Sequence, residues 1–179
     1  MKKSSTVYVG MDVHKESIDV ATGDEAGGEV RHHGKVGGDL ESVKKLVRKM
    51  VRKMESPAGE LIFVYEAGPS GFWIYRFLRS RGHACWVVSP GLTPRSNTDR
   101  IKTDRGDALK LCRLARAGEL SAIHVPDETD EAMRDLVRTR EDVVSMLRQA
   151  RQRLAALLLG NNIGYNKKTA WTEAWLQSR

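Results

Sequence analysis

The order of strands and helices in the first half of the chain limits its fold most strongly. Residues 6–13, 17–23 and about 29–36 favour strands, and the turn signals between them are short enough for antiparallel hairpins. Two later apolar segments, residues 61–66 and 84–88, each follow a predicted helix. Helical crossovers join parallel strands, whereas tight turns join antiparallel ones. The order therefore predicts an α/β fold, a mixed sheet flanked by helices.

The helices are predicted from apolar spacing and capping residues. Residues 40–54 form an amphipathic pattern that Asp39 can cap, and residues 72–81 form a second helix. The segment TDRGDALKLCRLARAG, residues 103–118, begins on the capping residue Thr103. These helices are expected to pack on the faces of the sheet.

A long helix is predicted from about residue 129 to residue 159. Its apolar residues follow a heptad pattern with Arg140 as a polar interruption: Met133, Leu136, Val143, Leu147, Ala150, Leu154 and Leu157. Such a stripe often packs in its own domain's core. The length of this helix nevertheless favours a coiled coil that joins subunits or carries another domain.

An unexpected carboxylate lies in the first predicted strand, VYVGMDV, residues 7–13. Most of this strand could be buried on both faces, so Asp12 is the exception. An ionised carboxylate away from water needs a positive partner, which can be a side chain, a backbone N–H group or a metal ion. Glu66 ends the strand 61–66, and if the two strands are neighbours, both acids leave the sheet on the same side.

Two further acids, Asp104 and Asp107, lie three residues apart at a predicted helix start. This spacing makes them neighbours on one helix face, with roughly 5–6 Å between their Cβ atoms. If the four acids converge, they repel one another and need divalent cations, and their hard oxygen ligands suit Mg2+ or Mn2+. Paired ions of this kind serve in-line displacement at phosphorus in nucleases and polymerases.

Each acid also has a purely structural explanation. Asp12 could cap the turn that follows its strand, and Glu66 could pair with a buried arginine. Asp104 and Asp107 could be acids that the helix dipole favours near a helix N-terminus. Their combination favours the metal site over these separate explanations.

The charge distribution points to an anionic partner. The chain has a formal net charge of +7, and its basic residues recur around residues 95–116 and 145–168, which suits phosphate contacts. The segment 44–53 has a plainer explanation as the solvated face of an amphipathic helix. The candidate nucleic-acid-binding residues are Arg95, Arg100, Lys102, Arg105, Arg148 and Arg151.

Several classes of protein are disfavoured. No apolar run approaches the length that crosses a bilayer, and the N-terminus lacks the pattern of a signal peptide, so we expect a cytoplasmic protein with no membrane partner. Cys85 and Cys112 lie far apart with no CxxC motif or Cys/His cluster. They indicate two small buried side chains and neither a disulfide framework nor a zinc site.

Several longer segments resemble a known family. VGMDVHKESIDVA, YEAGPSGFWIYRFLRSRGHACWVVSP, RIKTDRGDALKLCRLARAGEL and WTEAWL occur in the order found in the DEDD transposases of a large family of bacterial insertion sequences. Members of that family are bridge-RNA-guided recombinases, and the Piv-type DNA invertases are relatives. Motif by motif, the family's four acids fall on Asp12, Glu66, Asp104 and Asp107.

The resemblance implies an RNase H-like (RuvC-like) domain at residues 1–125, a coiled-coil helix at 126–162 and a helical tail at 163–179 that leads to a C-terminal domain. It also implies a DNA transposase or recombinase that cleaves and exchanges DNA strands at insertion-sequence ends. The four acids would be both its catalytic residues and its ligands for Mg2+ or Mn2+. The implied partners are DNA, a guide (bridge) RNA, and further copies in a homodimer or tetramer formed through the coiled coil.

One part of the family pattern has no counterpart in this sequence. In the family, the chain continues into a second domain with a serine thought to attack DNA, and no serine of these 179 residues matches it. The chain is therefore expected to fold and bind metal, but not to recombine DNA unaided.

Two rival functions remain compatible with the sequence. One is a stand-alone RuvC-type junction resolvase or RNase H-like nuclease, which shares the fold and metals but hydrolyses with water. The other is a non-catalytic nucleic-acid-binding dimerisation module whose acids are structural.

Overall fold

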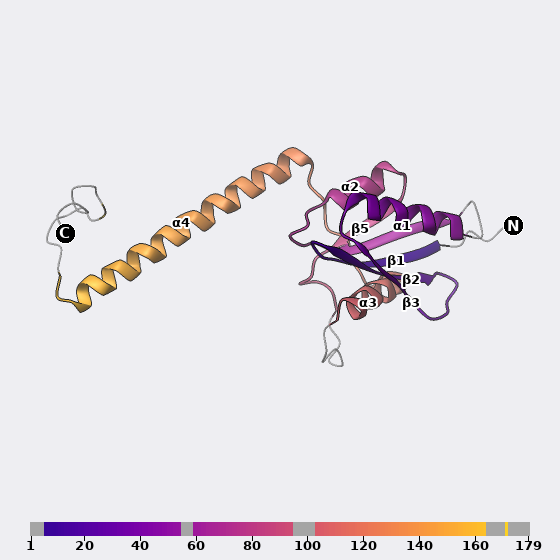
Figure 1. Cartoon of the computed structure of the whole chain (residues 1–179), viewed down its shortest axis with the longest axis horizontal. Coiled ribbons are helices and arrows are strands. Elements are labelled where there is room, and N and C mark those ends of the chain that lie inside the picture. The colour runs from indigo at the N-terminus through magenta and orange to yellow at the C-terminus, as the bar shows by residue number, and fades with distance from the viewer. Residues whose placement is uncertain (1–5, 55–58, 95–102, 164–170, 172–179) are drawn as a thin grey trace. The chain divides into compact units, whose positions relative to one another are not determined.

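The computed structural model describes residues 6–54, 59–94, 103–163 and 171. The chain divides into two compact units, Met1–Val125 and Pro126–Arg179 (Figure 1). Of the predicted helical tail at 163–179, only residues 163 and 171 belong to the described part of the chain.

The first unit contains a five-stranded mixed sheet. Its elements are β1 (Thr6–Val13), β2 (Ser17–Asp24), β3 (Arg31–Gly37), α1 (Leu40–Lys53), β4 (Glu60–Glu66), α2 (Trp73–Ser80), β5 (Ala84–Val88) and α3 (Asp104–Ala117). The strand order is β3-β2-β1-β4-β5. β2 is antiparallel to both β1 and β3, whereas β4 is parallel to both β1 and β5. The predicted mixed α/β sheet with flanking helices is therefore confirmed.

Helices cover both faces of this sheet. The alternate residues Val9 and Met11 of β1 lie on the face covered by α1 and α2, where they join the largest buried apolar cluster. Tyr8 packs on the other face, which α3 covers. Figure 1 shows α1 and α2 on one side of the strands and α3 on the other. The period-two alternation read from the sequence thus assigns Asp12 to the α3 face.

The absence of a side chain at Gly10 allows α3 to approach β1 closely. A Cβ atom at Gly10 would lie 2.3 Å from the carbonyl oxygen of Ala108 and 2.6 Å from the backbone nitrogen of Cys112. The Cys112 thiol also donates to the Tyr8 carbonyl oxygen at 3.3 Å. These contacts hold the helix that begins at Asp104 directly against the central strand.

Local signals in the sequence agree with the observed helix ends. Asp39 accepts a hydrogen bond from the Ser42 backbone nitrogen at the start of α1, and Thr103 accepts one from Gly106 at the start of α3. Both cysteines are buried free thiols, as expected. Burial raises the pKa of Cys85 to about 12 and that of Cys112 to about 11, so both remain protonated and unreactive.

The second unit contains α4 (Glu128–Gly160), a helix of 33 residues. Asp127 caps its start by accepting from the Asp130 backbone nitrogen at 2.8 Å. The predicted long helix is therefore confirmed. No residue of α4 is buried within the described part of the chain, and its exposed apolar residues include Met133, Leu136, Val143, Leu147, Leu154 and Leu157. Pairing of this apolar stripe with a second helix stays a prediction.

None of the helices that the structure describes combines the length and apolar composition needed to cross a bilayer.

The close contact at Gly10 generates a first prediction. The substitution Gly10→Ala should lower the unfolding free energy of the first unit by about 1–3 kcal/mol, because the added methyl group overlaps the backbone of α3. Chemical denaturation followed by circular dichroism would measure this change. Gly91→Ala is the matched control within the same unit, because Ser89 Oγ, at 3.8 Å, leaves the added carbon in ordinary van der Waals contact. Equal stability of the wild type and Gly10→Ala would contradict the close packing of α3 on β1.

Candidate functional site

The sheet register places the two strand acids beside each other. The parallel pairing of β1 with β4 runs as far as Met11 with Tyr65, so Asp12 and Glu66 are the next residues on their strands. Both therefore lie near the carboxyl ends of two central strands, on the face that α3 covers. Asp104 and Asp107 occupy the first turn of α3. We call Asp12, Glu66, Asp104 and Asp107 together the acid cluster.

A histidine joins two members of the acid cluster. His14 Nε2 lies 2.9 Å from Asp12 Oδ2 and 3.5 Å from Asp104 Oδ1. Potential ligand atoms of Asp12, His14 and Asp104 all lie within 4.8 Å of one another. One ring nitrogen thus sits between two carboxylates, where a cation would be stabilised by both.

The protonation energetics of Asp12 agree with a cation site. Burial raises the pKa of Asp12, and the nearby charges of Asp107 and Asp104 raise it further, while the contact with His14 lowers it in part. In the chain by itself, the surroundings therefore destabilise the ionised form of Asp12 relative to that of an exposed aspartate. A bound divalent cation would relieve both the desolvation and the repulsion. Carboxylate oxygens with one imidazole fit Mn2+ or Mg2+, of which Mn2+ accepts nitrogen ligands more readily.

The other two members of the acid cluster, Glu66 and Asp107, lie outside the trio of Asp12, His14 and Asp104. Among the described residues, Glu66 and Asp107 are not part of the trio whose ligand atoms come within 4.8 Å. Asp107 still acts on Asp12 through its charge, and Glu66 is the partly exposed last residue of β4. The structure thus brings Asp12 and Asp104 together, while Asp107 acts on Asp12 through its charge and Glu66 ends the neighbouring strand.

A buried carboxylate lies on the neighbouring strand, directly opposite the half-buried Asp12. Asp19 of β2 pairs with Asp12 in the register and is only 3% exposed. Its oxygens contact His32 Nε2 at 2.9 Å and Lys35 Nζ at 3.0 Å. Burial by itself would raise the pKa of Asp19, but the contacts with Lys35 and His32 outweigh it and lower the pKa. The environments of these two neighbouring aspartates therefore shift their pKa values in opposite directions.

Sequence reasoning did not select Asp19, His32 or Lys35. It pointed to His14 only as a residue that could assist a phosphate. The available signal was a carboxylate within the apolar segment SIDVATG, which raises the same question as the carboxylate within VYVGMDV. The partners of Asp19 could not be read from the sequence, since they depend on the pairing of β2 with β3.

The structure describes three of the six predicted nucleic-acid-binding residues. Arg95, Arg100 and Lys102 lie outside the described residues. Arg105 is exposed in the first turn of α3, next to Asp104. Arg148 and Arg151 are exposed on α4 and belong to the second unit.

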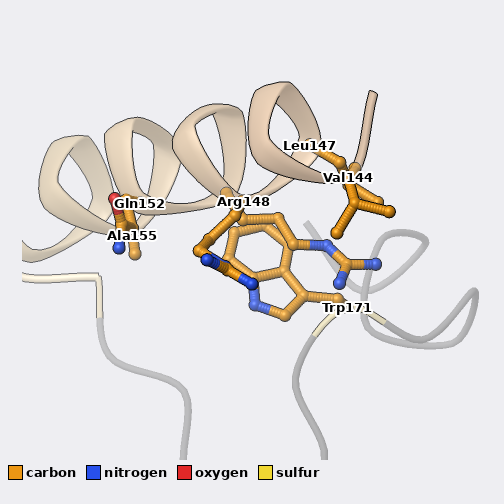
Figure 2. A pocket seen from close by; sticks show the side chains of 7 residues that line it. Val144, Leu147, Arg148, Gln152, Ala155 and Trp171 are labelled. Carbon is orange, nitrogen blue, oxygen red and sulfur yellow. The ribbon is translucent and has the colours of Figure 1, made fainter. Parts of the chain in front are cut away.

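The two α4 arginines line an open groove of about 430 Å3 together with Trp171. The guanidinium carbon of Arg151 is 5.7 Å from the centre of the Trp171 ring. Figure 2 shows Arg148 on the side of α4 that faces the Trp171 ring, among the other residues that line the groove. Exposed guanidinium groups beside an aromatic ring suit phosphate contacts and base stacking. This groove is a candidate surface for nucleic acid within the second unit.

The family model and the two curated relatives described next all have transposase in their descriptions. The model of the IS110-type DEDD transposase family, described as "Transposase", matches residues 9–162. The chain is 44% identical over 171 residues to "Putative transposase y4qE" of Sinorhizobium fredii, covering 95% of this chain and 43% of that protein. It is 40% identical over 173 residues to "Transposase for insertion sequence element IS1533" of Leptospira borgpetersenii, covering 96% of this chain and 48% of that protein. The chain thus spans less than half the length of these two relatives.

Solved structures give more distant neighbours. The T. thermophilus RuvC in complex with a Holliday junction substrate is 10% identical, with a TM-score of 0.42 over 66% of this chain and 99% of that one. A second Thermus thermophilus RuvC structure is 12% identical, with a TM-score of 0.41 over 65% of this chain and 99% of that one.

The opposite environments of Asp12 and Asp19 generate a second prediction. The folded-state pKa of Asp12 is above its ordinary value of 3.8, so the stability that its protonated form contributes is lost as the pH rises through that raised pKa. Asp12→Asn should therefore raise the melting temperature of the metal-free chain at neutral pH. This gain should vanish in acid, where the wild-type carboxyl group is protonated. Thermal melts in the presence of a chelator would measure both effects.

Asp19→Asn is the matched control, because the pKa of Asp19 is lowered. Its ionised form contributes stability above pH 3.8 that is lost as the pH falls through the lowered pKa. Asp19→Asn should therefore lower the melting temperature at neutral pH. Shifts of the same sign for both variants would contradict the assignment of these two environments.

Proposed function

Because the chain belongs to the IS110-type DEDD transposase family, we propose that its acid cluster serves metal-dependent cleavage and exchange of DNA strands at insertion-sequence ends. The observation that carries this proposal is the convergence of Asp12, His14 and Asp104, whose ligand atoms lie within 4.8 Å of one another. They come from the central strand β1, the turn after it and the start of α3. Such convergence of segments distant in sequence supports a shared ligand.

Asp12 and Asp104 would hold Mg2+ or Mn2+, with Glu66 and Asp107 completing the acidic set. When bound, the cation supplies stabilisation of the charge that develops on phosphate oxygens as a phosphodiester bond breaks. Asp12 contributes a partly desolvated carboxylate, which binds a cation more strongly than an exposed one does. His14 contacts both carboxylates, and its contact with Asp12 lowers the pKa of that aspartate in part.

Exposed cations near the acid cluster would position the DNA backbone. Arg105 lies beside Asp104 at the start of α3 and is exposed. We assign it a phosphate contact, together with Arg95, Arg100 and Lys102 of the preceding segment. Arg148 and Arg151 would contact DNA or a guide RNA on the second unit, with Trp171 available for stacking.

The activity of a whole protein of this family would need more than these 179 residues. They span 43% and 48% of the length of two curated relatives. We therefore propose that this part of the protein binds metal and nucleic acid, and that recombination also requires a C-terminal domain. Strand transfer catalysed by this chain without any other domain would contradict the second half of this proposal.

The apolar stripe of α4 would provide a homodimer or tetramer contact. In α4 the residues Leu136, Val143 and Leu147 are 66%, 58% and 50% exposed, respectively. Their heptad spacing suits a coiled coil with another copy of the chain. Assembly through α4 would place two acid clusters in one complex, as an exchange between two DNA sites requires.

The metal site is tested by calorimetry with Mn2+ and with Mg2+. The wild type should show saturable binding, and Asp12→Asn combined with Asp104→Asn should abolish it, because the two principal ligands become neutral. Asp135→Asn combined with Asp142→Asn on α4 removes the same charge elsewhere and should leave binding unchanged. Folded wild-type chain that binds neither ion would favour the structural explanation of the acids over a metal site.

The α4 contact is tested by analytical ultracentrifugation. The wild type should sediment as a dimer or larger, and Leu136→Glu combined with Leu147→Glu should sediment as a monomer, because buried like charges would oppose pairing. Ser145→Glu combined with Gln152→Glu adds the same charge outside the apolar stripe and should preserve the assembly. A wild-type chain that is monomeric at high concentration would remove the coiled-coil proposal.

A further inference from the structure

The edge strand β3 contains an irregularity next to the acid cluster. In its pairing with β2, Lys35 lies opposite Asp19 and His32 lies opposite Ala21, with a register shift that leaves His33 as an extra residue. In a regular strand, residues three apart point to opposite faces. The bulge instead allows His32 and Lys35 to occupy the same face, and bulges of this kind often redirect side chains near functional sites.

Both redirected side chains reach the buried carboxylate of Asp19. His32 Nε2 is 2.9 Å from Asp19 Oδ1, and Lys35 Nζ is 3.0 Å from Asp19 Oδ2. The Asp19 side chain is 4% exposed, so its charge depends on these two partners. The Lys35 side chain is 53% exposed, and its ammonium group is held by the ion pair with Asp19.

Lys35 also reaches the acid cluster. Its ammonium nitrogen lies 3.3 Å from Asp104 Oδ2, while the other oxygen of Asp104, Oδ1, lies 3.5 Å from His14. Each oxygen of Asp104 therefore has a defined neighbour, one on β3 and one toward Asp12. No other described residue is paired with Asp104 in an ion pair.

We propose that Lys35, anchored by Asp19, is a positioning residue that holds the Asp104 carboxylate of α3 toward Asp12. This inference rests on the proposed function, because it takes Asp104 as a metal ligand. Partners that orient a ligand commonly change metal affinity by 10–100-fold when removed. Lys35 would act in this way, through Asp104 and without contacting the ion.

Two roles of Lys35 predict opposite changes in metal affinity. As a simple point charge, an ammonium group near the acids would repel a metal ion, so its removal would strengthen binding. As a positioning residue, its removal would weaken binding. The direction of the change in Mn2+ affinity therefore separates the two roles.

The experiment measures Mn2+ binding by calorimetry for the wild type, for three substitutions at lysines and for Asp19→Asn. Lys35→Met should weaken binding by about tenfold or more, whereas Lys35→Arg, which keeps a cation that can bridge the two carboxylates, should restore most of the affinity. Lys53→Met removes the same charge from α1, on the other face of the sheet, and should change nothing. Asp19→Asn should weaken binding as Lys35→Met does, because Lys35 loses its anchor.

Hydrogen exchange in the metal-free chain supplies a second readout. Lys35→Met should speed amide exchange at residues 104–107 several-fold relative to Lys53→Met, because α3 loses its tie to β3. Unchanged or tighter Mn2+ binding by Lys35→Met would overturn the proposal. If the wild type binds no Mn2+, the metal site of the proposed function fails, and the exchange rates then decide whether Lys35 holds Asp104. Unchanged exchange at residues 104–107 would in that case overturn the positioning role.

Discussion

The close contact between α3 and β1 determines where the acid cluster of this chain lies. Gly10 leaves room for the backbone of α3, with its missing Cβ position only 2.3 Å from the Ala108 carbonyl oxygen. Because α3 crosses the central strand at this distance, its first turn ends up beside Asp12. A bulkier residue at position 10 would move the helix outward and take Asp104 with it. The acid cluster therefore depends on a packing contact that contains no acid.

Asp19 and Asp12, which lie near this contact, differ in how far neighbouring groups compensate their negative charge. Asp19 is more buried than Asp12, yet its pKa is lowered because His32 and Lys35 face it, whereas the pKa of Asp12 is raised because burial outweighs its single histidine partner. The contacts with His32 and Lys35 thus stabilise the ionised form of Asp19. The ionised form of Asp12 is not compensated to the same degree, and the proposed cation site depends on this difference.

The second unit has a different physical character. α4 has no buried residue within the described chain, and its apolar residues lie exposed along a heptad pattern. The helix therefore retains unburied apolar surface that a partner could cover. The proposed contacts of the second unit rest on this apolar surface and on the basic groove around Trp171, whereas the first unit is built around its own core.

The sequence by itself determined the elements and the candidate acids, and the tertiary structure decided how they meet. Alternation in VYVGMDV assigned Asp12 to one face, and a capping residue located the start of α3. The three-residue spacing of Asp104 and Asp107 at that start identified them as neighbours on one helix face. Alternation and capping are local properties, so they can be read along the chain. The pairing of Asp12 with Asp19, the bulge at His33 and the bridge from Lys35 to Asp104 join residues up to 69 positions apart. They depend on strand register and helix packing, which only the folded chain specifies.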